Sequence, residues 1–251
     1  MSNPAPASNW LLEVGSHTEV GHVRERNEDS LKVDESLGLF VVADGMGGHN
    51  AGERASHLAV EELQAFVSSR LDGEVDPETL AAAFHRANAV IFRESLEQPE
   101  RRGMGTTMTA LLFRADVCWI GHVGDSRAWR FRDGVCKQLT EDHSVIGDQI
   151  RQGILTPEQA LHHPMRSVLT RSLGSGAEVT VDVLQGGVQD GDLFILGTDG
   201  MTRVLDEAGI GQRAATAQDP GSLASDLVEF ACTEDGTDNV TVIVVRCSAG
   251  R

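Results

Sequence analysis

Four aspartates each border one of the most apolar, strand-like runs of the chain, and each has a glycine next to it or one residue away. They are Asp44, Asp125, Asp199 and Asp238. Because strand ends in a sheet are rigid, carboxylates placed there can converge on one fixed point. A neighbouring glycine lets the backbone turn sharply and approach a ligand closely. The pattern therefore favours a fold in which these strand ends meet.

The aspartates need a counter-charge if they converge, because like charges at close range repel one another. Mg²⁺ and Mn²⁺ prefer carboxylate, carbonyl and water oxygens. The sequence contains no HxH or HExxH motif and no cysteine cluster, which makes zinc a poor candidate. One aspartate beside a glycine usually marks only a turn, but several beside the most apolar runs predict an acidic metal site.

Net charge and the length of the apolar runs argue against several classes of protein. The chain has 21 Lys and Arg against 38 Asp and Glu, a formal net charge of −17, which disfavours binding to nucleic acids and to anionic membranes. No apolar run approaches the roughly 18 residues of a membrane helix. Residues 1–15 show no basic segment followed by an apolar stretch, so no signal peptide is predicted. We expect a cytoplasmic protein.

The remaining pattern predicts strands interrupted by helices. Helices are expected at residues 51–71, from Pro77 towards Glu97 with Asp76 as the N-cap, and near 219–233. Strand-like runs occupy residues 39–43, 107–114, 117–124, 127–132, 179–184, 192–197 and 239–247. Period-two and period-3.6 patterns thus alternate in blocks along the chain.

The order of these elements indicates one α+β domain. The Asp-Gly pair at 133–134 predicts a hairpin. Strands linked by hairpins favour antiparallel sheets, and helices grouped between them favour layers outside those sheets. We expect a single domain over residues 10–248, preceded by a loose segment at 1–9.

Six short segments give the chain a family likeness. They occur in the order VRERNEDS (23–30), VVADGMGGHNAGE (41–53), GMGTTMTALL (103–112), VGDSRAWRFRDG (123–134), LGTDGMTRVL (196–205) and DGTDNVTVIVV (235–245). Any one of them is a weak signal, but all of them in this order between Glu13 and Arg246 are a strong one. Together they resemble the metal-dependent Ser/Thr protein phosphatase family known as PP2C or PPM, in its compact bacterial form.

The resemblance implies a four-layer α-β-β-α sandwich, with two largely antiparallel sheets flanked by helices and a centre of two Mn²⁺ or Mg²⁺ ions in a cleft at one end. By motif match, Asp44 bridges both metals and the Gly45 carbonyl binds one of them. Asp199 and Asp238 match the remaining direct ligands. Asp125 matches a ligand of a third, weaker metal site, which it shares with Asp199.

Three further residues match roles around the metals. Glu28 and Asp29 match carboxylates that hold metal-bound waters, and Arg24 matches the arginine that grips the substrate phosphate. Many members of the family carry a His directly after the Asp-Gly pair as general acid. Here that position is Met46, which cannot donate a proton. A metal-bound water and His49 are the remaining candidates, and a surface or packing role for His49 is favoured.

Residues 141–175 match the variable flap beside the active site in that family. Its Arg166 and Arg171 either contact phosphoprotein substrates or belong to a solvated helical face, and the sequence leaves both interpretations open. The adjacent His162 and His163 cannot both point inward from one helix face, so no metal site is predicted there.

The implied reaction is the hydrolysis of phosphoserine and phosphothreonine monoesters in proteins. Two cations roughly 3.5–4 Å apart neutralise the phosphate charge and make a bridging water acidic enough to attack phosphorus without a phosphoenzyme. Arg24 adds a bidentate grip on the phosphate that Lys could not reproduce. The expected partners are phosphorylated protein substrates and an opposing eukaryotic-like Ser/Thr kinase, with the protein itself a monomer.

Two alternatives remain open. A phosphodiesterase or nucleotide hydrolase would use the same metals, but the acidic chain shows no basic or aromatic strip that would bind bases. A catalytically silent phosphatase-fold module would bind a partner without chemistry, because a fold does not guarantee an activity. Such a module is expected to lose metal ligands, and all the matched acids are present here.

Overall fold

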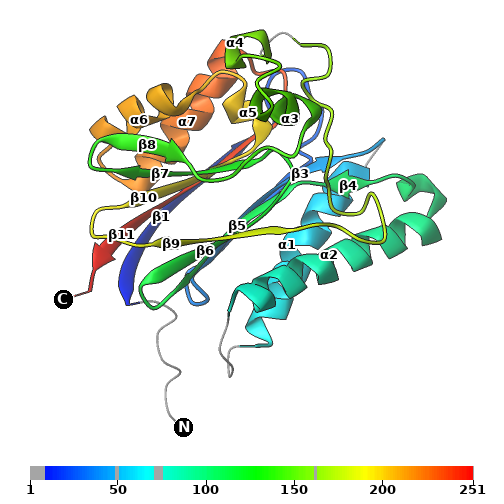
Figure 1. The fold of residues 1–251 in the computed structure, drawn as a ribbon, viewed down its shortest axis with the longest axis horizontal. Helices are drawn as coiled ribbons and strands as arrows, with labels where there is room; N and C mark the ends of the chain where they lie inside the picture. Colours follow the sequence, from blue (N-terminus) through cyan, green and yellow to red (C-terminus); the bar gives the residue numbers. More distant parts are fainter. Residues whose placement is uncertain (1–8, 49–50, 71–75, 161–162, 251) are drawn as a thin grey trace.

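The structure is a computed structural model in which two β-sheets stack face to face, with a pair of helices on each outer side (Figure 1). It describes residues 9–48, 51–70, 76–160 and 163–250. The loose segment expected at 1–9, apart from Asn9, lies outside these residues, as do His49 and His162. The expected four-layer α-β-β-α sandwich is confirmed.

The five-stranded sheet pairs the first and last strands of the fold. Its order is β1 (Trp10–Glu19), β11 (Val240–Ala249), β10 (Leu193–Gly197), β7 (Arg127–Arg132) and β8 (Val135–Gln138). Every neighbouring pair is antiparallel. β7 and β8 form the predicted hairpin, in which the φ angles of Asp133 and Gly134 are 52° and 79°, as a tight Asp-Gly turn requires.

The six-stranded sheet is also antiparallel throughout. Its order is β2 (Asp29–Asp34), β3 (Leu39–Met46), β5 (Met108–Arg114), β6 (Val117–Val123) and β9 (Asp182–Gly187), and the short β4 (Gly105–Thr106) pairs with β3. β9 begins later than the strand expected at 179–184. Val179 and Val181 pack against the helices as their alternation indicates, but pairing with β6 starts only where Asp182 meets His122.

The helices cover the outer faces of the sheets. α1 (Ala51–Ser68) and α2 (Pro77–Glu97) cover the six-stranded sheet, and α6 (Glu207–Thr216) and α7 (Pro220–Glu234) cover the other one. The shorter pieces are η1 (Pro99–Arg101), α3 (Val145–Arg151), α4 (Pro157–Ala160) and α5 (Asp199–Thr202). Within the described ranges, no helix combines the length and the apolar character that crossing a bilayer requires.

The start of α2 follows the sequence closely. The Asp76 carboxylate accepts a hydrogen bond from the Thr79 N–H at 2.8 Å, and Pro77 stands in the first turn. α6 was not expected from the sequence. Only Ile210 and Ala214 are buried in this helix, so its apolar stripe is too short to stand out.

Three aromatic side chains join the two sheets. Phe40 on β3 packs edge-on against Phe113 on β5, with ring centroids 5.8 Å apart, and Phe113 meets Phe194 on β10 at 5.3 Å. All three are buried, and each such pair adds about 0.5–1.5 kcal/mol beyond the burial of its area. The Phe40–Phe113 contact lies within the six-stranded sheet, and the Phe113–Phe194 contact crosses to the other sheet and helps to set the position of one sheet against the other.

The register brings the aspartate-bearing strand ends to one end of the sandwich. In the six-stranded sheet, Asp44 near the end of β3 lies opposite Asp29 at the start of β2. In the five-stranded sheet, Gly197 at the end of β10 lies opposite Val242 near the start of β11. Both places lie at the upper end of the sandwich in Figure 1, away from the start of β1. The candidate site is built on this end.

Candidate metal centre

Asp44 stands at the centre of the site, and hydrogen bonds hold its backbone in place. Its N–H donates to Thr107 Oγ1, and its carbonyl accepts from the Thr107 N–H and from Thr106 Oγ1, each at 2.9 Å. Burial and then the charges of neighbouring carboxylates raise the pKa of Asp44 well above its usual range. Those neighbours are Asp29, Asp199, Asp125 and Asp238. The structure therefore brings together all the aspartates that the strand ends predicted.

Asp29 has one satisfied and one unsatisfied carboxylate oxygen. Its Oδ2 accepts from Thr198 Oγ1 at 2.8 Å, whereas its Oδ1 is buried without a hydrogen-bond partner among the described residues. Burial raises the pKa of Asp29 to about 7, although the hydroxyls of Thr241 and Thr198 act in the opposite direction. A buried carboxylate oxygen without a partner is costly unless a water or a cation satisfies it.

Asp125, which follows Gly124 after the end of β6, is desolvated in the same way. Burial raises its pKa to about 8, the nearby Asp199 and Asp142 carboxylates add to the effect, and Arg127 opposes it. Arg127 grips Asp142 with two hydrogen bonds, from Nε to Oδ1 at 2.8 Å and from Nη2 to Oδ2 at 2.7 Å. Sequence reasoning did not single out Asp142, because the contact forms only when the chain after β8 folds back over β7.

Asp199 and Asp238 share an arginine. Arg203 Nη2 donates to Asp199 Oδ2 at 2.8 Å and to Asp238 Oδ2 at 2.6 Å. Arg24 Nη2 also lies on Asp238, 2.9 Å from Oδ2 and 2.8 Å from Oδ1. Asp199 Oδ1 is buried and has no hydrogen-bond partner within the described part of the chain. Arg203 was missed from the sequence, although its spacing of four residues from Asp199 in a helical turn is a signal that would have found it.

Gly45 occupies a place where no side chain fits. Its N–H donates to the Glu28 carbonyl at 3.1 Å, and a Cβ atom there would come within 2.1 Å of the Gly52 carbonyl oxygen. Glu28 is fixed in turn by Asn239, whose Oδ1 accepts from the Glu28 N–H at 2.8 Å. Glu28 Oε1 is buried, again without a hydrogen-bond partner among the residues described. Asn239 is another positioning residue that sequence reasoning did not name.

The donor set fits hard divalent cations. In the described ranges, no three His, Cys, Asp or Glu side chains are arranged to chelate an ion as they stand, and two arginines contact Asp238 instead. Yet burial, and then neighbouring carboxylates, raise the pKa of several of these groups, and buried oxygens of Glu28, Asp29 and Asp199 have no hydrogen-bond partner among the described residues. Carboxylate and carbonyl oxygens in such number are the ligands that Mg²⁺ and Mn²⁺ take.

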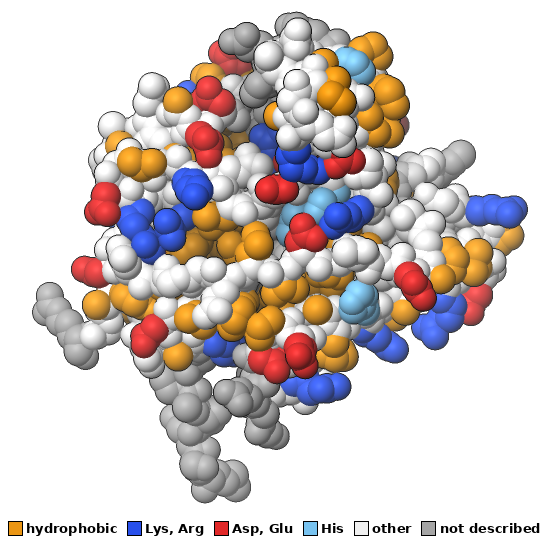
Figure 2. Space-filling view, viewed as in Figure 1, with side chains coloured by type: hydrophobic (Ala, Val, Ile, Leu, Met, Phe, Trp, Pro, Cys, Tyr) orange, Lys and Arg blue, Asp and Glu red, His pale blue; other side chains and the backbone are white. Residues whose placement is uncertain are grey.

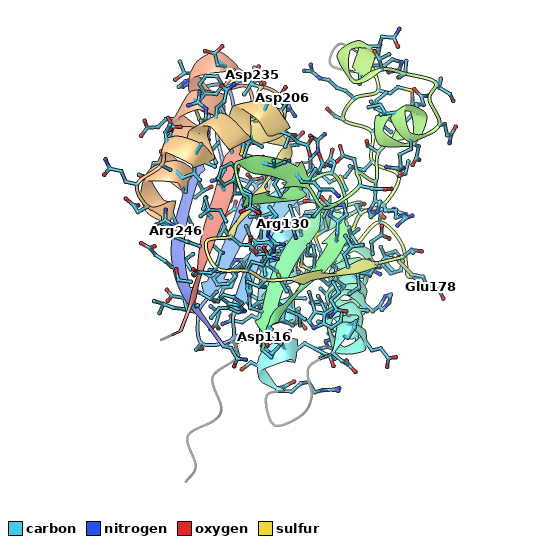
Figure 3. All side chains as sticks on the ribbon, turned by 60° about the vertical axis from the view of Figure 1, so that its left-hand side comes forward. Asp116, Arg130, Glu178, Asp206, Asp235 and Arg246 are labelled. Carbon is cyan, nitrogen blue, oxygen red and sulfur yellow. The ribbon has the colours of Figure 1, made fainter. Side chains whose placement is uncertain are left out.

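The flap segment, residues 141–175, carries α3 and α4 and stands to one side of the sandwich, across from α6 and α7 (Figure 3). Arg171, towards its end, donates to Asp182 Oδ1 of β9 at 2.7 Å. Arg166 lies on the exposed surface of the flap. Contact of Arg166 or Arg171 with a substrate stays a prediction.

His143 braces the turn that leads into Asp125. Its backbone N–H donates to the Gly124 carbonyl at 2.7 Å, and its Nδ1 accepts from the Gly124 N–H at 3.1 Å. Because Nδ1 accepts, Nε2 carries the proton and donates to Asp182 Oδ2 at 3.0 Å. Figure 2 shows a histidine among acidic and basic side chains beneath the flap.

His122 makes the stability of the metal-free protein depend on pH. It is fully buried, with Nε2 3.0 Å from the Glu141 carbonyl and Nδ1 2.9 Å from Thr109 Oγ1. Burial, and then the adjacent His143, lower the pKa of His122 to about 4, against about 6.5 in an unfolded chain. Its neutral ring therefore stabilises the fold above pH ~6.5, and this contribution is lost as the pH falls towards 4.

We expect His122→Gln to remove this dependence. Between pH 7 and pH 5 the free energy of unfolding should fall by about 2 kcal/mol more in the unmodified protein than in the variant. Urea unfolding in chelator at both pH values measures the difference, and groups common to both proteins cancel. His85→Gln, on the exposed face of α2, should keep the unmodified pH dependence. Equal losses in all three proteins would show that His122 is not the group responsible.

The chain is similar to known protein phosphatases. The profile of the family described as "Protein phosphatase 2C" matches residues 16–230. The serine/threonine protein phosphatase PstP of Mycobacterium tuberculosis is 36% identical over 234 residues, which are 93% of this chain but 45% of PstP. The serine/threonine phosphatase stp of Listeria innocua is 33% identical over 235 residues, 91% of this chain and 93% of stp. This chain thus spans about half of the mycobacterial relative and nearly all of the other.

A solved structure with a closely similar fold contains metal ions. The crystal structure of the catalytic domain of the serine/threonine protein phosphatase PstP, in complex with 2 manganese ions, superposes with a TM-score of 0.85 at 32% sequence identity. The likeness covers 95% of this chain and 99% of that one.

Proposed function

The chain belongs to the protein phosphatase 2C family, and we propose that it hydrolyses phosphoserine and phosphothreonine monoesters in proteins with two bound Mn²⁺ or Mg²⁺ ions. The observation that carries the proposal is the gathering of carboxylates around Asp44. Asp29 lies opposite it in the sheet, and the charges of Asp125, Asp199 and Asp238 act on it. One nitrogen of Arg203 contacts both Asp199 and Asp238. Carboxylates crowded in this way are stable together when cations lie between them. A structure with two manganese ions in a protein of the same fold supports the number of ions.

In this proposal Asp44, the Gly45 carbonyl, Asp199 and Asp238 hold the two cations, and Asp125 with Asp199 serves a third, weaker site. The cations supply neutralisation of the phosphate charge and activation of a water for attack on phosphorus. Glu28 and Asp29, whose free oxygens are buried, orient the waters around them.

Arg24 binds the substrate phosphate through its guanidinium. Its side chain is 47% exposed and hydrogen-bonds to Asp238, so it can reach a phosphate that lies beside this carboxylate. Two N–H groups of the planar guanidinium can donate hydrogen bonds to two phosphate oxygens. Met46 cannot protonate the leaving alkoxide, and His49 lies outside the described residues.

Several further features complete the proposal. We place the activity in a single domain over residues 10–248, with the flap at 141–175 beside the substrate. The partners are phosphorylated proteins, opposed by a Ser/Thr kinase, and the enzyme acts as a cytoplasmic monomer. The names of the relatives, which are Ser/Thr protein phosphatases, support phosphorylated proteins as the substrate class.

A peptide panel tests the proposal directly. Phosphate release from matched pSer, pThr and pTyr peptides is measured with Mn²⁺, with Mg²⁺ and with excess chelator. We expect pThr and pSer to be cleaved about tenfold faster than pTyr, and the chelator to remove the activity. Bis-p-nitrophenyl phosphate is included as a diester substrate. Faster cleavage of the diester or of pTyr, or turnover that survives the chelator, would overturn the proposal.

A further inference from the structure

Arg203 is a partly buried cation among the carboxylates of the centre. Its side chain is 20% exposed, and the carboxylates that it contacts, Asp199 and Asp238, are 18% and 13% exposed. One nitrogen, Nη2, makes both contacts, at 2.8 Å and 2.6 Å. Charges with so little access to water interact more strongly than a surface ion pair does.

Backbone contacts hold the turn that carries Arg203 in place. Its N–H donates to the Asp199 carbonyl at 3.1 Å and so closes the single turn of α5. Met201 anchors this turn in the core. Gly200 lies so close to Asn239 that a Cβ atom would come within 2.1 Å of the Asn239 carbonyl oxygen. The turn that carries Arg203 is thus pressed against the loop that carries Asp238.

Asp199 and Asp238 differ in how many of their carboxylate oxygens accept hydrogen bonds. Asp238 has partners on both oxygens, because Oδ1 accepts from the Asn239 N–H at 3.0 Å and Oδ2 accepts from Arg24 and Arg203. Asp199 gives only Oδ2 to Arg203, and its Oδ1 is buried with no hydrogen-bond partner in the described ranges. A divalent ion can therefore bind Asp199 Oδ1 directly, but it has to displace Arg24 and Arg203 in order to bind Asp238 Oδ2.

We propose that Arg203 is an internal counter-ion that competes with divalent cations for Asp238 and so sets the affinity of the centre for Mn²⁺ and Mg²⁺. This inference rests on the proposed function, since it assumes that Asp199 and Asp238 are metal ligands. In the metal-free protein Arg203 neutralises part of the carboxylate repulsion and stabilises the fold. In the presence of metal, its positive charge opposes the incoming ion. Arg203 is thus a positioning residue rather than a catalytic one.

Titration calorimetry with Mn²⁺, in the absence of any substrate, tests the proposal. Arg203→Met keeps much of the aliphatic stem and removes the charge, so it should lower the Kd for Mn²⁺ about tenfold. Arg203→Lys keeps the charge and should stay within about threefold of the unmodified protein. Arg213→Gln is the matched control. It removes an arginine from α6, where Arg213 pairs with Asp226 and lies over Phe230, and it should leave the Kd unchanged.

A thermal measurement gives a second readout. Metal-free Arg203→Met should melt a few degrees below the unmodified protein, and Mn²⁺ should raise its Tm by more. If metal-free Arg203→Met is unfolded and shows no melting transition, that result still supports the counter-ion role, provided that Arg203→Lys folds and binds Mn²⁺ normally.

A result that overturns the proposed function can be distinguished from one that overturns only the proposed role of Arg203. A wild-type protein that binds no Mn²⁺ would overturn the proposed function itself. Normal wild-type binding with an unchanged or weaker affinity in Arg203→Met would overturn only the competition, and weaker binding would assign Arg203 to holding the ligands in place. Equal tightening in Arg213→Gln would reduce the effect to net charge and also overturn it.

Discussion

Replacing Asp44 by Asn is expected to lower kcat/KM for Mn²⁺-dependent hydrolysis of a phosphothreonine peptide on the order of 10³-fold. Burial, and then the charges of four neighbouring aspartates, raise the pKa of Asp44 well above its usual range, so its carboxylate lies among the acids expected to hold the cations. An amide oxygen carries no net charge and is a poor bridge between two cations. Asp199→Asn should act in the same direction. Phosphate release is measured over a range of Mn²⁺ concentrations, so that weak binding and lost turnover are distinguished.

The Asp44→Asn protein should nevertheless fold. Burial and neighbouring charges raise the pKa of Asp44 in the folded state, so at a pH above the usual Asp pKa the carboxyl group ionises more readily in the unfolded chain and favours unfolding, a cost that a neutral amide does not have. The metal-free Tm should be equal or higher. Asp116→Asn is the control, because Asp116 is exposed at the opposite end of the sandwich (Figure 3). If Asp44→Asn kept more than about a third of the activity, Asp44 would not be a metal ligand.

The strand ends show which features of the site could be predicted from the sequence. Apolar runs next to Asp44, Asp125, Asp199 and Asp238 predicted strands and a shared site, and the fold does bring these residues together. This worked because a strand buried on both faces has a continuous apolar sequence that ends where the polar site begins. The N-cap at Asp76 was predictable for a similar reason, since its partner lies three residues away.

Contacts between distant segments were not predictable. Arg203 meets Asp238 only because α5 packs against the loop before β11, and Arg127 meets Asp142 only because the flap folds back. A single sequence gives no measure of which arginine will meet which acid when many of both are present. The same limit applies to His143, which supports Gly124 through contacts that depend on the folded flap.

Elements with weak apolar patterns were also missed or displaced. α6 buries only Ile210 and Ala214, so tertiary contacts rather than its own stripe decide that it is a helix. β9 starts at Asp182 although its apolar alternation begins at Val179, because pairing with β6 and not the side-chain pattern decides where a strand begins.

Arg24→Ala is expected to lower kcat/KM for the same peptide about 10²-fold, the second largest effect. The loss removes a charge-assisted, two-pronged contact with the phosphate. Because an amine offers one point of contact instead of a planar fork, Arg24→Lys should recover only part of the activity and remain about tenfold impaired. Inorganic phosphate should inhibit both variants more weakly, since the contact is made to the phosphate and not to the peptide.

Arg24 also hydrogen-bonds to Asp238, and this gives its substitution a second, opposite effect. Removing a cation from Asp238 should not weaken Mn²⁺ binding and is expected to tighten it modestly. Lower activity together with undiminished Mn²⁺ affinity would therefore separate a phosphate-binding arginine from a structural one. Arg86→Ala, which removes an arginine of α2 paired with Glu62, should change neither quantity. Full activity in Arg24→Lys would instead mean that only the charge matters, and a loss of Mn²⁺ binding in Arg24→Ala would mean that Arg24 supports the metal ligands.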